Sequence, residues 1–331
     1  MLIFLVLMKK KLEKEWQSKG KAFKPSIFFV NFVIEFNLLV LVVIPLNQLP
    51  AVTLLMEKRK VLFISQEMTP YLATGRTISE ISRSLPQAVM DQGYEIRNFM
   101  PRFGCINERR HQLHEVIRLS GMNIVVNDMD QPLIIKVASI PAARTQVYFI
   151  DNEEYFKRKH TTQDEKGNCF ADNDERAIFF ARGVFETVKK LGWSPDIIHC
   201  HGWMTSLVPV YLKNLYHEDP LFQHTKVVQS LYSTDAFEEN LNPEFPKKVL
   251  AEDMREEQFN PENTSYEAII KESLRYTDAV VSGIEKVSES LLDAVDKTEH
   301  LTHLRVQNQD SLPDAVIAMY EDILENTFVG H

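Results

Sequence analysis

The side chains best suited to chemistry in this 331-residue chain are two histidines, His199 and His201, at the end of a short apolar run. Residues 196–200 follow a Ser-Pro breaker and read as an interior parallel strand. Open α/β sheets bind ligands just beyond the carboxyl ends of their strands, so the turn at Gly202 is a predicted active-site position. No carboxylate follows the histidines in this turn. Apolar residues then recur at helical spacing: Trp203, Leu207, Val210 and Tyr211.

A metal centre at these histidines is disfavoured, although Cys200 lies between them. Successive strand residues point to opposite faces, so the three side chains cannot all converge on one ion. The other two cysteines, Cys105 and Cys169, form no CxxC pair, and the total of three is odd. Free thiols in a reducing compartment are the simplest interpretation.

The composition is that of an ordinary globular chain, with 25% charged and 44% hydrophobic residues. The length allows one large domain or two small ones. The net charge of −9 argues against a nucleic-acid partner held mainly by phosphate contacts.

Residues 1–55 differ from the rest: seven lysines and three glutamates give them +4, which leaves −13 for the remainder of a chain of total −9. Residues 27–46 are mostly apolar and nominally long enough to cross a bilayer, but Glu35 is unfavourable inside one. Three interpretations compete: a membrane anchor with a basic flank at 9–24, a signal sequence, or sequence upstream of a true start at Met56. The third is favoured and predicts a cytoplasmic protein, whereas the first predicts membrane association through residues 27–46.

From Lys60 onward, short apolar runs alternate with helical periodicity, as expected of βα units around a parallel sheet. Residues 243–263 are charged and contain prolines, which predicts a surface excursion or mobile loop. Strands are predicted at 61–65, 96–100, 133–140, 146–150, 196–200, 226–231 and 279–282. Helices are predicted to begin near residues 76, 172, 202, 266 and 283, and a terminal amphipathic helix spans 311–328.

Six segments, in order and at proper spacing, resemble motifs of the bacterial glycogen and plant starch synthases, which are glucosyltransferases of the GT-B fold. The resemblance covers residues 58–295 and only the N-terminal Rossmann-like half of that fold. It implies a doubly wound parallel α/β sheet at 56–295, between an unexplained extension, 1–55, and a linker with a helix, 296–331. The segments are 60–71 (family motif SEVAPF), 85–97 (LPKAL…GHDVR), 147–158 (VYFIDNEDYFKR), 172–186 (DNxxRFxxFSRAALE), 196–209 (DIIHCHDWHTALVP) and 271–282 (AxxVTTVS).

This resemblance implies transfer of glucose from ADP-glucose or UDP-glucose to the non-reducing end of an α-1,4-glucan, with no other cofactor and no metal. The glucosyl donor would lie in a cleft between two Rossmann-like halves, and the C-terminal half would supply most of the nucleotide pocket. No segment after residue 295 resembles that half, so a partner chain that supplies it is one expectation. The other is a non-catalytic relative that binds glucan or a synthase.

The family's first loop reads Lys-Thr-Gly-Gly-Leu, and its lysine and glycine amides approach the phosphates of the glucosyl donor. Here the loop begins at Ala73 in place of the lysine, and Arg76 replaces the second glycine. Thr74, Gly75 and Arg76 are therefore the candidate donor-binding residues. The guanidinium of Arg76 suits a phosphate, but it can also obstruct close backbone approach. A solvated loop arginine is the favoured interpretation.

The family motif HDWHT places an aspartate and a histidine near the transferred sugar, and here these positions hold Gly202 and Met204. Neither side chain can bond a sugar hydroxyl or balance positive charge. A sugar-contacting histidine at the end of the family's next strand is also missing from residues 231–234. His199 and His201 remain as candidate sugar-binding residues, although structural imidazoles bonded to neighbouring backbone are favoured over catalysis.

Two expectations concern the remaining chain. The carboxylates Glu67, Asp151 and Asp172 are available as acids, but nothing in their spacing selects them for hydrolysis. The terminal helix, 311–328, has an apolar stripe that needs burial, and it is predicted to pack over a surface that a C-terminal half would have covered.

Overall fold

The computed structural model describes residues 29–35, 38–44, 58–140, 145–233, 237, 240–250 and 254–325. Its contacts divide the chain into two units, Met1–Glu57 and Lys58–His331. Each unit is described by itself.

The first unit contains an antiparallel hairpin of β1 (Phe29–Glu35) and β2 (Leu38–Ile44). The predicted spanning segment, 27–46, is therefore extended rather than helical over its described residues. Valine, isoleucine and phenylalanine make up five of the seven residues of β1, and valine and isoleucine make up four of the seven of β2; these residues favour extended backbone. Across the described stretches of the chain, no helix is both long and apolar enough to cross a membrane. The other residues of 1–55 lie outside the described ones.

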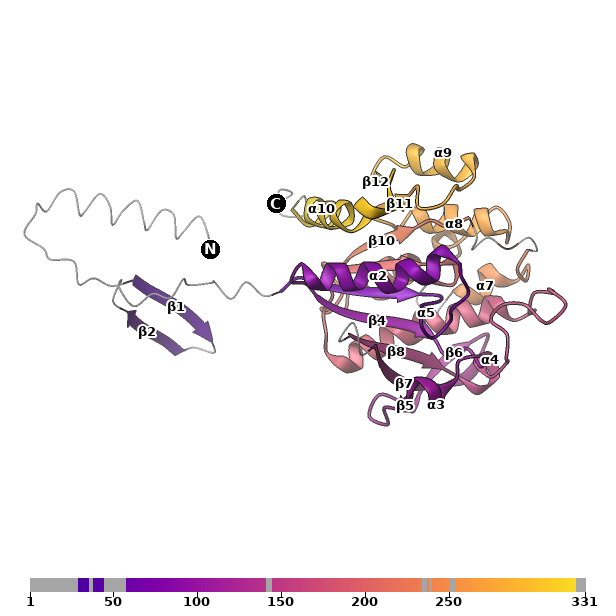
Figure 1. Ribbon diagram of the computed structural model, residues 1–331, viewed down its shortest axis with the longest axis horizontal. Helices are drawn as coiled ribbons and strands as arrows, with labels where there is room; N and C mark the ends of the chain where they lie inside the picture. Colours follow the sequence, from indigo (N-terminus) through magenta and orange to yellow (C-terminus); the bar gives the residue numbers. More distant parts are fainter. Residues whose placement is uncertain are drawn as a thin grey trace, which may run out of the picture. The chain divides into compact units, whose positions relative to one another are not determined.

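The second unit is built on a ten-stranded sheet of order β12-β11-β10-β9-β3-β4-β8-β7-β5, with β6 paired to β7 (Figure 1). The first seven of these strands run parallel, and β5, β6 and β7 add antiparallel pairings at one side. This sheet confirms the predicted Rossmann-like α/β architecture. The strands are β3 (Lys60–Ser65), β4 (Glu95–Pro101), β5 (His114–Glu115), β6 (Met122–Val126), β7 (Met129–Ile140), β8 (Thr145–Asp151), β9 (Ile197–His201), β10 (Lys226–Ser230), β11 (Ala279–Ser282) and β12 (Thr302–Arg305).

The strand order reverses at β3. The chain moves from β3 to β4 and β8 on one side, then returns to β9, β10, β11 and β12 on the other. Ser65 at the end of β3 is in register with His201 at the end of β9, and the Gln66 amide donates to the His201 carbonyl at 2.9 Å. In open α/β sheets, ligands bind at such a switch point, beyond the carboxyl ends of the strands.

Two helical layers cover the sheet. On one face, α2 (Thr77–Asp91) and α10 (Leu312–Glu325) lie side by side over one buried apolar cluster (Figure 1). The other face buries a larger cluster beneath α5 (Asn173–Leu191), α6 (Leu207–Asn214), α8 (Tyr266–Leu274) and α9 (Glu289–Lys297). Short helices complete the unit: α3 (Glu108–His111), α4 (Glu153–Phe156), η2 (Trp203–Thr205), α7 (Phe245–Val249), η3 (Glu256–Gln258) and η4 (Gln309–Ser311).

The interpretation of the residues between 296 and the terminal helix as a linker is wrong, because β12 lies among them and pairs in parallel with β11. The terminal helix, whose residues 326–328 lie outside the described ones, packs on the flat face of the sheet beside α2. It is therefore a layer of this unit and not a cover for the carboxyl edge. The physical reason is that its apolar stripe matches the apolar side chains of the central strands on that face.

The segment 243–263 is also better anchored than its composition indicated. Phe245 and Val249 of α7 are buried, as is Phe259, and the Tyr211 hydroxyl donates to the Val249 carbonyl at 2.9 Å. Lys248 forms ion pairs of 2.8 Å with both Asp174 and Glu175 at the start of α5. The high content of charged side chains in this segment made it resemble a loop, although its few apolar side chains are buried. The helix expected from residue 283 begins later, at Glu289.

Candidate active site at the carboxyl ends of β3 and β9

The turn that follows β9 is locked against the end of β3. Gly202 has φ 96° and ψ 154°, a conformation that only glycine adopts readily. The Met204 amide donates to Gln66 Oε1 at 3.2 Å, and the Thr205 hydroxyl donates to the Gly202 carbonyl at 2.6 Å. Gln66 and Met204 are both buried, so the Met204 side chain belongs to the core and does not face a ligand.

No side chain fits at position 202. A Cβ there would lie 2.7 Å from the Cβ of Gln66 and 3.0 Å from Cδ1 of Ile78 in the first turn of α2. Contacts shorter than 3.0 Å between carbons force one group to move. The turn after β9, the end of β3 and the start of α2 are therefore in direct contact at this point.

The loop before α2 presents the other candidate residues. Thr74 and Gly75 are exposed, and Gly75 has φ +74° with open space around it. The Arg76 amide donates to Thr74 Oγ1 at 3.3 Å, and Arg76 occupies the N-cap position of α2. The loop thus leads directly into a helix N-terminus, which favours bound anions.

Arg76 is held by a buried carboxylate. Its Nη2 lies 2.7 Å from Oε1 of Glu67, and the Glu67 side chain is only 1% exposed. Burial raises the pKa of the Glu67 carboxyl, and the neighbouring Arg76 guanidinium and Thr74 hydroxyl oppose that rise. The arginine is therefore not a freely solvated loop side chain, because a buried carboxylate holds its guanidinium. The spacing of the carboxylates in the sequence did not select Glu67 as a site residue. Its position directly after the predicted strand 61–65 was a signal that could have done so.

Both histidines are fully buried on the face covered by α2 and α10. His199 Nδ1 is 2.6 Å from the hydroxyl of Tyr320 on α10, and its Nε2 is 2.8 Å from Ser230 Oγ. His201 Nδ1 is 2.7 Å from the Tyr232 hydroxyl. Their partners are thus side-chain hydroxyls, not the neighbouring backbone that was expected.

Burial strongly lowers the pKa of both imidazoles, to about 3 for His201, and the proximity of His201 lowers the pKa of His199 further. Both rings are neutral at physiological pH, and neither reaches solvent. In this structure, neither side chain is placed to exchange a proton with a ligand in solvent.

The elements that form this site lie within a region that matches a known protein family. The family model described as the starch synthase catalytic domain matches residues 60–303, which include every element around the turn and the loop. The chain belongs to this starch synthase family. A glycogen synthase from Chlorobaculum tepidum is 35% identical over 243 residues, covering 71% of this chain and 47% of that protein. One from Chlorobium luteolum is 41% identical over 175 residues, covering 53% and 36%.

Among solved structures, the catalytic domain of starch synthase IV from Arabidopsis thaliana, bound to ADP and acarbose, has a TM-score of 0.60. It is 16% identical, and the match covers 75% of this chain and 51% of that one, which supports a shared fold. The chain spans less than half of the length of both curated glycogen synthases.

The two other carboxylates considered from the sequence, Asp151 and Asp172, are both committed to ion pairs. Asp151 lies 3.0 Å from Arg102 and 3.1 Å from Lys136. Asp172 accepts from Arg158 at 2.7 Å. Neither forms a pair of carboxyl groups suited to glycoside hydrolysis.

A serine, a histidine and an aspartate also align outside this site, which sequence analysis missed. Ser282 Oγ is 2.8 Å from His303 Nε2, and His303 Nδ1 is 3.0 Å from Asp296 Oδ1. Ser282 is only 2% exposed, too enclosed for a substrate carbonyl to reach its hydroxyl. The series therefore joins β11, β12 and α9 and has a structural role.

Among the described residues, no group of three histidine, cysteine, aspartate or glutamate side chains is arranged to hold an ion. Cys200 packs into the cluster on the opposite face of the sheet from His199 and His201, as strand alternation requires.

The buried histidines make stability depend on pH. A lowered pKa means that the unfolded chain binds protons more readily than the folded one, so stability decreases as pH falls below the ordinary value of 6.5. From pH 7 to pH 5, we expect a loss on the order of 2 kcal/mol for each histidine. Urea unfolding at both pH values measures it. The variant His201→Gln should lose about half as much, and an equal loss in parent and variant would contradict the assignment.

Proposed function

We propose that this chain forms one half of a glucosyltransferase that transfers glucose from ADP-glucose or UDP-glucose to an α-1,4-glucan. The observation that carries the proposal is the family match over residues 60–303, which includes the whole switch point of the sheet. The glucosyl donor would bind beyond the carboxyl ends of β3 and β9, where such sheets bind ligands.

Arg76 would bind the diphosphate of the donor. It stands at the N-terminus of α2, where backbone amides favour anions, and it compensates for the lysine that Ala73 replaces. Its side chain is 32% exposed, so a ligand can reach it. The ion pair with Glu67 limits its rotamers, and a guanidinium has five N–H donors with which to contact both a carboxylate and a phosphate.

This chemistry requires no proton from the buried histidines. The departing nucleoside diphosphate accumulates negative charge, which cations and amide dipoles stabilise. In this proposal, His199 and His201 keep the ends of β9 and β10 in place through their hydroxyl partners.

Both curated glycogen synthases extend well beyond the part that matches this chain, and the proposal requires a second half of the cleft as well. The second half of the cleft would come from a partner chain or from further sequence of the same protein. The test is incorporation of radiolabelled glucose from each nucleotide sugar into glycogen, by the chain alone and with candidate partner chains. Incorporation that depends on the chain supports the proposal, and its absence under every condition contradicts it.

A non-catalytic relative that binds glucan or a synthase is the second candidate. The turn at Gly202 favours it, because no polar side chain extends from positions 202 or 204 toward a sugar. Glycogen binding without incorporation, whichever partner is added, would establish this alternative.

The role of Arg76 predicts a loss of donor affinity on mutation. Arg76→Ala combined with Glu67→Gln should weaken ADP-glucose or UDP-glucose binding about tenfold, because one charge-assisted contact to phosphate is lost. The second substitution avoids leaving a buried carboxylate unpaired. Titration calorimetry gives the affinities. The control Arg83→Ala, on the same helix but away from the loop, should bind like the parent, and an unchanged affinity in the double variant would refute the role of Arg76.

A further inference from the structure

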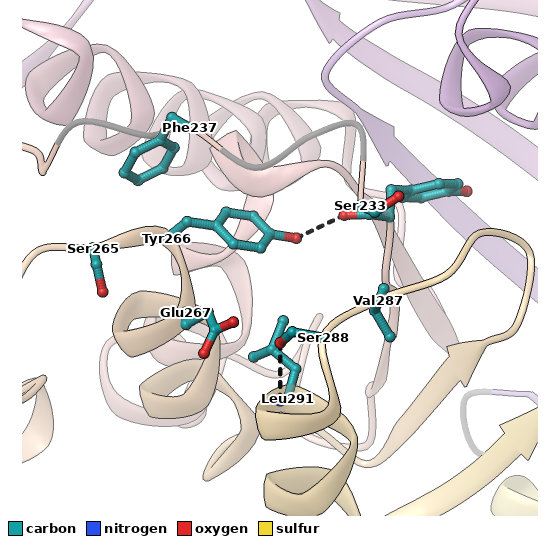
Figure 2. Close-up of a pocket in the computed structure, with 9 residues that line it drawn as sticks. Ser233, Phe237, Ser265, Tyr266, Glu267, Val287, Ser288 and Leu291 are labelled. Carbon is teal, nitrogen blue, oxygen red and sulfur yellow. Dashed lines mark hydrogen bonds between the residues drawn. The ribbon is translucent and has the colours of Figure 1, made fainter.

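A cavity of about 300 Å³ opens beside the end of β10, between the first turns of α8 and α9 (Figure 2). It is separate from the turn at Gly202 and the loop that holds Arg76. Its volume is at the small end of the range for ligand sites, about 300–1,000 Å³. The residues that line it are Tyr232, Ser233, Phe237, Ser265, Tyr266, Glu267, Val287, Ser288 and Leu291.

One side of the cavity is aromatic. The Tyr266 hydroxyl donates to the Tyr232 carbonyl at 3.0 Å, which fixes the orientation of the ring (Figure 2). The Phe237 ring packs edge-on against Tyr266, with centroids 5.8 Å apart. Val287 and Leu291 add aliphatic surface. Such a wall suits the C–H face of a flat, partly apolar ligand.

The other side of the cavity is polar and carries the Glu267 carboxylate, which forms an ion pair of 3.7 Å with Lys271, a residue of α8 outside the lining. Figure 2 shows Glu267 of α8 facing Ser288, which caps α9 by accepting from the Leu291 amide at 3.2 Å. The hydrogen bond from Ser288 is the main cause that lowers the pKa of Glu267, so this carboxylate is ionised and accepts hydrogen bonds. Ser233 and Ser265 add hydroxyl groups: Ser233 donates to Glu285 at 3.1 Å, and Ser265 caps α8 by accepting from the Ala268 amide at 3.3 Å.

We propose that this cavity binds one pyranose unit of an α-glucan. A sugar ring presents C–H groups on its faces and hydroxyl donors at its edge, which match the aromatic wall and the carboxylate. A phosphate or nucleotide does not match, because the lining has a carboxylate and no lysine or arginine, and the nearby Lys271 is engaged by Glu267 and by Ser290. The cavity is therefore chemically distinct from the loop that holds Arg76.

The position of the cavity assigns the sugar to the acceptor side. Tyr232 joins the two regions: its carbonyl accepts from Tyr266 at the cavity, and its hydroxyl bonds His201 at the end of β9. A glucan held in the cavity therefore lies next to the proposed transfer site. That this glucan is the acceptor rests on the proposed function, whereas its binding does not.

The test is titration of the full chain with maltoheptaose, using cellohexaose as the β-linked control. We expect the parent to bind maltoheptaose and Glu267→Gln to bind it about fivefold more weakly, because a charged acceptor is lost. Glu289→Gln changes the same type of side chain in the first turn of α9 but does not line the cavity, and it should bind like the parent. Circular dichroism melting checks that each variant is folded.

A measurement on the unmutated protein makes the test independent of variant folding. In methyl-labelled protein, maltoheptaose should shift the resonances of Val287 and Leu291 and leave those of Val125, on the β6–β7 hairpin, unchanged. Absence of binding, or binding without these shifts and without an effect of Glu267→Gln, would overturn the proposal. Donor binding is titrated separately, so an intact affinity for ADP-glucose would then leave the proposed function standing.

Discussion

A chain that ends before Leu312 is expected to lose its cooperative fold. Removal of α10 exposes the apolar cluster that this helix shares with α2 and the central strands. The lost burial is on the order of 10 kcal/mol, since each large side chain contributes roughly 1.5–3 kcal/mol, and a whole domain is stable by only about 5–15 kcal/mol. The helix side chains concerned are Leu312, Val316, Met319, Tyr320, Ile323 and Leu324.

The deletion also removes two polar contacts that side chains of α10 make. The buried His199 Nδ1 on β9 loses its hydrogen bond with the Tyr320 hydroxyl, and the Tyr94 hydroxyl loses its hydrogen bond to Glu321. The single variant Tyr320→Phe isolates the first of these, and it should lower the free energy of unfolding by about 1–3 kcal/mol.

Circular dichroism melting and gel filtration compare the truncated chain with the parent. A chain that ends after Glu325 keeps every α10 contact described above and serves as the control, with a melting temperature equal to that of the parent. A truncated chain that lacks α10 but still melts cooperatively at the parent's temperature would show that the helix is dispensable.

The role of α10 illustrates what the sequence could and could not predict. The helix itself was predictable, because its apolar residues recur at helical spacing. Its location was not, since the matching apolar face is assembled from strands up to about 250 residues earlier in the chain. The preceding strand, β12, was missed because Thr302–Arg305 is a short polar stretch at the sheet edge, where little burial is required.

The central strands were predicted more closely, because apolar runs bounded by breakers leave little choice of position. Ala279–Ser282, for example, was predicted with the bounds that β11 has in the structure. The environment of the histidines was beyond prediction, because their hydroxyl partners Ser230, Tyr232 and Tyr320 come from other elements. Sequence spacing gives the face of a strand but not the side chains that meet it from α10 or β10.

The second large effect is expected at the turn after β9, where Gly202→Asp would restore the acid that the family motif predicts. We expect this variant to be destabilised by roughly 4 kcal/mol. Backbone strain at φ 96° and ψ 154° contributes about 1–3 kcal/mol, and overpacking adds about 1–3 kcal/mol. The overpacking arises because the new Cβ would lie 2.7 Å from the Cβ of Gln66.

Two further variants separate strain from collision. Gly121→Asp introduces the same side chain at a positive φ of +84° with nothing within 4 Å, so it should show backbone strain without collision, about 1–3 kcal/mol. Gln66→Gly in the Gly202→Asp background removes the colliding Cβ and should restore part of the stability, although the Met204 amide then loses its acceptor. Urea unfolding gives all three values.

These values decide how the missing acid is to be understood. If the Gly202→Asp variant is as stable as the parent, the turn relaxes easily, and the glycine is a simple loss of a sugar-contacting group. If it is destabilised and Gln66→Gly rescues it, the glycine and Gln66 form one packing arrangement in which a carboxylate has no room. In that case, a single substitution cannot restore the family's site, and glucosyl transfer by this chain would have to rely on Arg76 and the α2 amides for its electrostatic stabilisation.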